Sequence, residues 1–176
     1  MKRAILAAGP PGSGRTTFCH QRAKVVGATL IEEEELMLEV FGSIKGFQYL
    51  FRQHDEYSRA VWNRVEETLS GDNALIILDI WSGSPDSRNQ IASKLKNLGA
   101  HEVILWYFAT PLKQCLAWTA EKNDDWSERK RKIKLKSCEK SFLAFHTHSS
   151  VEEIEASAFD SFKIIKPHLA RPLVSY

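Results

Sequence analysis

The chain has 176 residues, of which 43% are hydrophobic and 26% are charged, and its formal net charge is +2. This length suits one folded domain with a core of its own, and the composition excludes a disordered or fibrous protein. Because the charge is nearly balanced, any binding to nucleic acid would have to come from a local patch. No apolar run approaches the roughly 20 residues that span a bilayer, so we expect no membrane partner.

The three cysteines, Cys19, Cys115 and Cys138, lie far apart in the sequence and outside any metal-binding spacing. This usage indicates reduced thiols, each buried in a helical segment. The first residues lead straight into an apolar strand, so the sequence predicts no signal peptide. Together these features predict a cytoplasmic protein.

A glycine-rich turn follows the first apolar run, residues 4–8. Its spacing matches the phosphate-binding pattern G-x-x-x-x-G-K-[ST] at Gly9, Gly14 and Thr16. Such a turn wraps a triphosphate with successive backbone N–H groups, and the next helix points its positive end at the phosphates. A turn that binds nothing is the alternative, but the strand before it and the helix after it favour nucleotide binding. The predicted nucleotide-binding residues are Gly9, Pro10, Pro11, Gly12, Ser13, Gly14, Arg15, Thr16 and Thr17.

Arg15 stands where the pattern usually has lysine. Lysine supplies a compact point charge, whereas arginine supplies a planar fork with five donors. We expect nucleotide binding to survive this replacement and the rate of phosphoryl transfer to be affected by it. The hydroxyl of Thr16 is suited to a magnesium ion.

Four consecutive acids, Glu32 to Glu35, follow a short predicted strand at residues 28–31. One interpretation is a solvated helix start, where negative charge suits the helix dipole. The other is that one carboxylate faces the phosphate site and serves as general base toward an acceptor hydroxyl. A long amphipathic helix is expected from about residue 48 to 70, and the aromatic residues Phe47, Tyr49 and Phe51 at its start are either core or stacking surfaces.

Residues 74–79 form a near-continuous apolar run that ends in Asp79, as expected for a strand buried on both faces of a parallel sheet. An aspartate in this position commonly lies beside magnesium, so Thr16 and Asp79 are the predicted metal ligands. The alternative is an aspartate that caps the next turn. The following loop and helix carry Arg88.

A fourth strand is predicted at residues 102–108 and a last edge strand at about residues 159–167. Between them, the stretch 128–136 is strongly basic and opens an amphipathic helix. A solvated face and a lid that contacts substrate are both consistent with this charge run. We expect one domain at residues 1–167, with the lid at about 121–140, and a C-terminal tail at residues 168–176.

The alternation of strands and helices predicts an α/β fold, with about five parallel strands and helices on both faces of the sheet. The phosphate loop, the acid run, Asp79 and the loop before Arg88 each follow a strand. Because ligands bind at the carboxyl ends of parallel strands, these groups are expected to converge on one active site.

On these motifs the chain resembles small AAA-type P-loop kinases of the polynucleotide 5′-kinase type and, more loosely, zeta-toxin and small-metabolite kinases. The resemblance covers residues 2–167 and implies a P-loop NTPase fold with a basic helical lid. It implies that Glu34, or Glu33 beside it, replaces the family's aspartate base, and that Trp81-Ser82 replaces its asparagine. The catalytic residues it implies are Arg15, Glu34, Asp79, Arg88, Arg129 and Arg131.

The resemblance implies an ATP-dependent phosphotransferase that moves the γ-phosphate to a hydroxyl, with ATP or another nucleoside triphosphate and Mg²⁺ as cofactors. The first candidate acceptor is the 5′-hydroxyl of a single-stranded polynucleotide, and a nucleoside, nucleotide or small metabolite is the alternative. A second alternative, which follows from Arg15, is a nucleotide-binding module that has lost most of its transfer activity.

Overall fold

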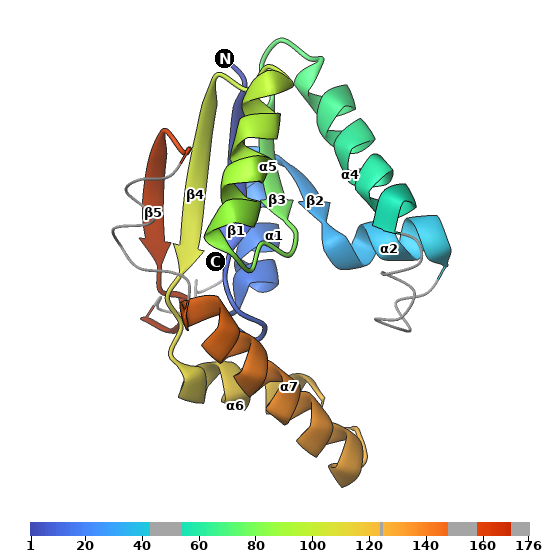
Figure 1. Ribbon diagram of the computed structural model, residues 1–176, viewed down its shortest axis with the longest axis vertical. Helices are drawn as coiled ribbons and strands as arrows, with labels where there is room; N and C mark the ends of the chain where they lie inside the picture. The colour runs from blue at the N-terminus through green and yellow to red at the C-terminus, as the bar shows by residue number, and fades with distance from the viewer. Residues whose placement is uncertain (43–53, 124, 148–157, 170–176) are drawn as a thin grey trace.

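The computed structural model of the protein describes residues 1–42, 54–123, 125–147 and 158–169 (Figure 1). Within these residues five strands form one sheet in the order β2-β3-β1-β4-β5, and every neighbouring pair is parallel. The predicted α/β architecture is therefore confirmed. The strands are β1 (Arg3–Ala8), β2 (Thr29–Glu32), β3 (Leu75–Asp79), β4 (Glu102–Phe108) and β5 (Ser161–Ile165).

Helices connect these strands and cover both faces of the sheet (Figure 1). The helices of the described residues are α1 (Arg15–Val26), α2 (Glu33–Phe41), α4 (His54–Leu69), α5 (Pro85–Asn97), α6 (Leu112–Lys122) and α7 (Glu128–Thr147), with a short 3-10 helix η1 (Pro167–Leu169). None of these helices is long and apolar enough to cross a membrane.

The central strand β1 separates two apolar clusters, because alternate side chains of a strand point to opposite faces. Ala4 and Leu6 pack with α4, α5 and the end of α7, whereas Ile5 and Ala7 pack with α1. Strands that are buried on both faces carry nearly continuous apolar sequence, which explains the composition of β1, β3 and β4.

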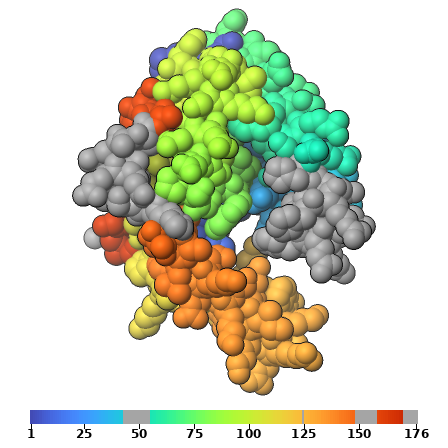
Figure 2. Space-filling view, viewed as in Figure 1, coloured from blue at the N-terminus to red at the C-terminus, as the bar shows by residue number. Residues whose placement is uncertain are grey.

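Helices α6 and α7 lie beyond the carboxyl ends of β1 and β4, and α7 projects away from the sheet (Figures 1 and 2). The same end of the sheet holds the turn after β1 and the start of α2. This arrangement gathers the predicted functional segments at one edge, as ligand sites in parallel sheets require.

Candidate active site

The turn between β1 and α1 has a backbone that requires glycine at two positions. Gly12 has φ of 75° and Gly14 has φ of 80°, both in the left-handed region that side chains disfavour. A Cβ atom on Gly12 would lie 2.5 Å from Oγ1 of Thr119 and 2.6 Å from the carbonyl oxygen of Cys115. The two glycines therefore allow both the turn and its close contact with α6.

The carbonyl oxygens of this turn are turned into the protein. The Gly9 carbonyl accepts a hydrogen bond from Nη1 of Arg15 at 3.2 Å, and the Ser13 carbonyl accepts one from Oγ1 of Thr110 at 2.7 Å. The Pro10 carbonyl accepts from the backbone N–H of Ser13 at 3.2 Å, and the Gly14 carbonyl accepts from that of Phe18 at 3.0 Å. The Pro11 carbonyl accepts from Sγ of Cys138 at 3.3 Å. With its acceptors occupied in this way, the turn leaves mainly N–H donors for a ligand.

Helix α1 begins directly after this turn, and its amino end is left open. The N-cap residue is Gly14, no side chain caps the end, and no acid stands in the first turn. The first N–H groups of a helix have no partner within the helix, and the dipole makes them a positive end. The turn and this helix end together fit the anionic phosphates of a nucleotide.

Arg15 reaches across the turn to the end of β3. Its Nε contacts Oδ1 of Asp79 in an ion pair, without the geometry of a hydrogen bond. The Asp79 side chain is 1% exposed and that of Arg15 is 15% exposed, so the pair is well shielded from water. The arginine thus neutralises the aspartate that the sequence predicts as a metal ligand.

The environment of Asp79 fits a divalent cation. Neither carboxylate oxygen accepts a hydrogen bond from the described residues, although both are buried. Buried carboxylates without hydrogen bonds are costly unless a cation compensates them. Thr16 lies in the first turn of α1 and would be the second ligand, with hard oxygen donors of the kind magnesium prefers.

Glu33, the first residue of α2, faces this pair of charges. Burial raises the pKa of Glu33, the positive charge of Arg15 opposes that rise, and the negative charge of Asp79 adds to it. The backbone amide of Trp81 also faces the carboxylate and lowers its pKa in part. A carboxylate with a raised pKa beside the phosphate loop has the properties of a general base.

Glu34 occupies a more open position than Glu33. Its side chain is 56% exposed, and its carboxylate lies 4.0 Å from Nζ of Lys122 at the end of α6. The structure therefore places Glu34 on the exposed side of α2, opposite Lys122 of α6, and Glu33 next to Arg15 and Asp79. Between the two glutamates that the sequence leaves open, the geometry favours Glu33.

Two tryptophans near the site were not assigned as binding residues from the sequence. Trp81 follows β3, is 46% exposed, and its ring fills the space where a Cβ on Gly83 would lie. The Trp118 ring would lie 2.9 Å from a Cβ on Gly14, against the phosphate loop. In the sequence, Trp81 could have been found from its position two residues after Asp79, at the end of a strand. Nothing in the local sequence marks Trp118 as a residue of the site.

Arg88 is inside the protein, 3% exposed. Its Nη1 donates to the Ser82 carbonyl at 3.0 Å, and its guanidinium lies 5.3 Å from the centre of the Phe145 ring. These contacts join the loop after β3 to the end of α7. The structure thus gives Arg88 packing partners on two elements at the carboxyl edge of the sheet.

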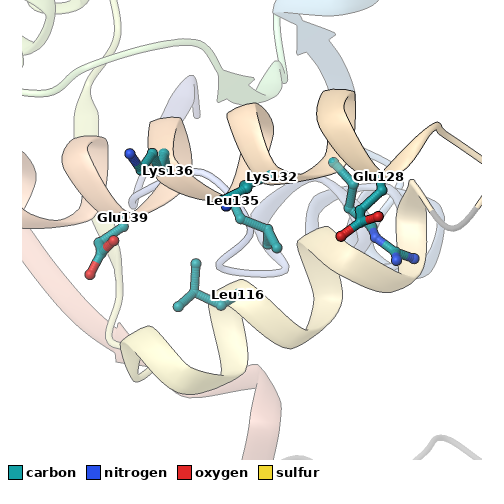
Figure 3. A pocket seen from close by; sticks show the side chains of 7 residues that line it. Leu116, Glu128, Lys132, Leu135, Lys136 and Glu139 are labelled. Atoms are coloured by element: carbon teal, nitrogen blue, oxygen red, sulfur yellow. The ribbon is translucent and has the colours of Figure 1, made fainter.

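Arg129 and Arg131 stand in the first turn of α7. Arg129 is exposed, and Arg131 lines an open groove of about 460 Å³ between α6 and α7 (Figure 3). The remaining lining residues are Leu116, Glu128, Lys132, Leu135, Lys136 and Glu139. The middle of α7 is hydrogen-bonded to the phosphate loop, through Cys138 and the Pro11 carbonyl. The aromatic residues Phe47, Tyr49 and Phe51 lie outside the described residues.

Comparisons with known proteins give the fold a context. No curated protein sequence matches the chain. Among solved structures, "a putative kinase" from Chloroflexus aurantiacus matches with a TM-score of 0.63 at 12% identity, over 97% of this chain and 89% of that one. A structure from the PezAT toxin–antitoxin system of Streptococcus pneumoniae matches with a TM-score of 0.63 at 17% identity, over 97% and 70%.

An uncharacterized protein from Eubacterium ventriosum matches with a TM-score of 0.53 at 12% identity, over 94% of this chain and 90% of that one. At these identities the likeness shows the shared fold alone. The model of the AAA_33 family, described as an AAA domain, matches residues 5–142, which include the phosphate loop, the acid run, Asp79 and the start of α7. The chain therefore belongs to the AAA_33 family of P-loop, kinase-like AAA domains.

Proposed function

We propose that this protein is an ATP-dependent kinase that transfers the γ-phosphoryl group to a hydroxyl. The observation that carries the proposal is the arrangement of one donor-rich turn, the buried Asp79 and the half-buried Glu33 around Arg15. The turn and the open end of α1 would bind the phosphates, and Arg15 would neutralise charge that develops during transfer. Bound magnesium, with Thr16 and Asp79 as ligands, would add positive charge at the phosphates.

The acceptor hydroxyl would lose its proton to Glu33 as its oxygen attacks the γ-phosphorus, and ADP would leave. The geometry supports Glu33 rather than Glu34, because burial raises the pKa of Glu33 and its carboxylate faces Arg15 and Asp79. Glu34 and Lys122, which lie opposite each other and are both exposed, are better placed to contact an acceptor as it binds. Arg88 would hold the loop after β3 in position, since its guanidinium is buried against the Ser82 carbonyl.

The acceptor that we favour is the 5′ end of a single-stranded polynucleotide. The backbone amide of Trp81 faces Glu33, its side chain is 46% exposed, and a flat aromatic surface stacks nucleobases without regard to sequence. The exposed cations at the start of α7, Arg129 among them, would act as a lid and attract a phosphate backbone. A nucleoside or nucleotide would use the same ring and is the alternative acceptor.

The acceptor is identified by incubating the protein with labelled ATP and Mg²⁺, and with either a 5′-hydroxyl oligonucleotide or a panel of nucleosides and small metabolites. We expect label on the oligonucleotide, and we expect Trp81→Ala to raise the KM for it by about tenfold because one stacking contact is lost. Val25→Ala, which shortens an exposed apolar side chain in the last turn of α1, is the control. Label on small molecules alone would overturn the polynucleotide proposal.

A second function is supported by the ion pair of Arg15 with Asp79, because the guanidinium competes with a metal ion for the same carboxylate. The protein would then bind nucleotide without transferring phosphate and would act on a partner. Measurable ATP affinity with no turnover on any acceptor, unchanged in Arg15→Lys, would favour this function over the kinase.

A further inference from the structure

Outside the phosphate site, three side chains from three consecutive elements converge at the edge of the sheet. They are His20 on α1, Glu32 at the end of β2 and Glu35 on α2. One ligand atom from each, an imidazole nitrogen and two carboxylate oxygens, lies within 4.8 Å of the others. Imidazole with carboxylates is a donor set for borderline divalent ions such as Zn²⁺.

Charge and burial in this cluster favour a cation. Glu32 has a side chain only 8% exposed, and Oε2 of this residue lies 2.6 Å from Nε2 of His20. Within the described part of the chain, no lysine or arginine pairs with Glu32 or Glu35. Asp79 is the register partner of Glu32 on the neighbouring strand, and its own charge is offset by Arg15. One imidazole thus faces two carboxylates, one of them almost fully buried.

The geometry also leaves room for exchangeable ligands. His20 is 42% exposed and Glu35 is exposed, so water can reach the open side of the cluster. Two ligands of a tetrahedral zinc ion lie about 3.4 Å apart, because each bond is about 2.1 Å long. The contact between His20 and Glu32 would have to open by roughly 1 Å, a movement available to an exposed side chain on a helix.

We propose that His20, Glu32 and Glu35 form a binding site for one Zn²⁺ ion, separate from the nucleotide site, with water completing the coordination. The ion ties α1 to α2, and both helices begin at the phosphate site: α1 with Arg15 and α2 with Glu33. Zinc would therefore stabilise the relative placement of these two residues. The site does not depend on the proposed kinase activity.

The test is zinc binding by the full-length, metal-free protein, measured by competition with a chromophoric chelator in the absence of nucleotide and magnesium. We expect one equivalent of zinc with a Kd of about 10 μM or tighter, and a raised midpoint of thermal unfolding when zinc is added. His20→Asn and Glu35→Gln each remove one ligand and should weaken binding at least tenfold. Circular dichroism of both variants checks that they fold.

Two control variants separate this site from other places where zinc could bind. Glu66→Gln changes an exposed glutamate on α4 and should bind zinc as the wild type does. Asp79→Asn should also retain zinc binding, because Asp79 belongs to the nucleotide site. Co²⁺ bound in place of zinc should give visible absorption bands of low coordination number that His20→Asn abolishes.

Zinc binding that is unchanged in both His20→Asn and Glu35→Gln would overturn the proposal, and so would the absence of binding at 100-fold higher zinc than the expected Kd. In either case the contact of His20 with Glu32 would be a simple ion pair that joins α1 to β2. Loss of zinc binding in Asp79→Asn together with retention in His20→Asn would place the ion at the nucleotide site.

Discussion

The guanidinium of Arg15 contacts the carboxylate of Asp79 and also donates from Nη1 to the Gly9 carbonyl, 3.2 Å away. One side chain thereby connects the end of β3 to the beginning of the phosphate loop. A bidentate fork can make both contacts at once, whereas a lysine ammonium is a single compact charge. The replacement of lysine by arginine therefore has a structural consequence that the loop pattern alone does not reveal.

Removal of the arginine should destabilise the protein. Arg15→Ala leaves the Asp79 carboxylate, 1% exposed, without its compensating charge, and breaking a buried pair costs about 3 to 5 kcal/mol. Arg15→Lys keeps a positive charge and should lose less stability than Arg15→Ala. Urea unfolding at pH 7 measures both. Equal stability of Arg15→Ala and the wild type would contradict the pairing. Added Mg-ATP should stabilise the wild type in the same experiment if it binds the folded state.

The pKa of Glu33 leads to a prediction about pH. Burial raises the pKa of Glu33 above its ordinary value of 4.5, so the folded state favours the protonated carboxyl. The unfolding free energy contributed by this group is then highest below about pH 4.5 and falls as the pH rises through the folded pKa. Glu33→Gln, which cannot ionise, should reduce this fall and be more stable than the wild type at pH 7.

The control for this effect is Glu34→Gln, the adjacent exposed glutamate. It should leave the pH dependence of stability close to that of the wild type. The stability of Glu33→Gln will still depend on pH to some extent, because burial also raises the pKa of Glu32. In a kinase assay, Glu33→Gln should lower kcat by about 10² to 10⁴, the contribution of a general base. A greater loss of kcat in Glu34→Gln would transfer the role of base to Glu34.

Two glycines allow a test of the phosphate loop. Gly12→Ala adds a methyl group 2.5 Å from Oγ1 of Thr119 at a residue with φ of 75°. Gly27 has φ of 65° and nothing within 4 Å of an added Cβ, so Gly27→Ala bears the backbone strain alone, about 1 kcal/mol. Gly12→Ala should be destabilised further, by about 1 to 3 kcal/mol, and should lose nucleotide affinity. Chemical unfolding and calorimetry with ATP compare the two variants.

The three thiols should be unreactive in the native state. Cys19, Cys115 and Cys138 are all buried, and none of them forms a disulfide. Burial raises the pKa of Cys115 to about 12 and that of Cys19 beyond the range of ordinary buffers, so few thiolates form. Iodoacetamide at pH 8 should label none of them until urea is added, as mass spectrometry would show. Rapid native labelling of Cys115 or Cys138 would indicate that α6 and α7 move apart from the rest of the protein.

The order of strands and helices was predictable because each element carries its own pattern. The apolar runs that end at Ala8, Asp79 and Phe108 became β1, β3 and β4, and Gly27 ends α1 as a C-terminal glycine. The convergence of the phosphate loop and Asp79 followed from the parallel sheet. Such inferences need only local periodicity and the rule that ligands bind at the carboxyl ends of strands.

The side-chain relations inside the site were not predictable in the same way. The contact of Arg15 with Asp79 joins α1 to the end of β3, and no local pattern specifies it. The choice between Glu33 and Glu34 depends on how α2 is rotated about its axis, which four consecutive glutamates do not specify. The resemblance implies Arg88 as a catalytic residue, but its buried contacts with the Ser82 carbonyl and the Phe145 ring depend on how α5, the loop after β3 and α7 pack together. Long-range packing decides these relations, and a single sequence shows only the local part.

The hydrogen bond from Cys138 to the Pro11 carbonyl fixes the middle of α7 to the nucleotide turn. Ten residues separate Cys138 from Glu128 at the start of the helix, a lever arm of about 15 Å at 1.5 Å per residue. A rotation of α7 by about 10° around this contact would move its first turn, which carries Arg129 and Arg131, by about 3 Å, the length of one hydrogen bond. A small tilt of α7 at its contact with the nucleotide turn therefore becomes a larger displacement at the amino-terminal end of the helix.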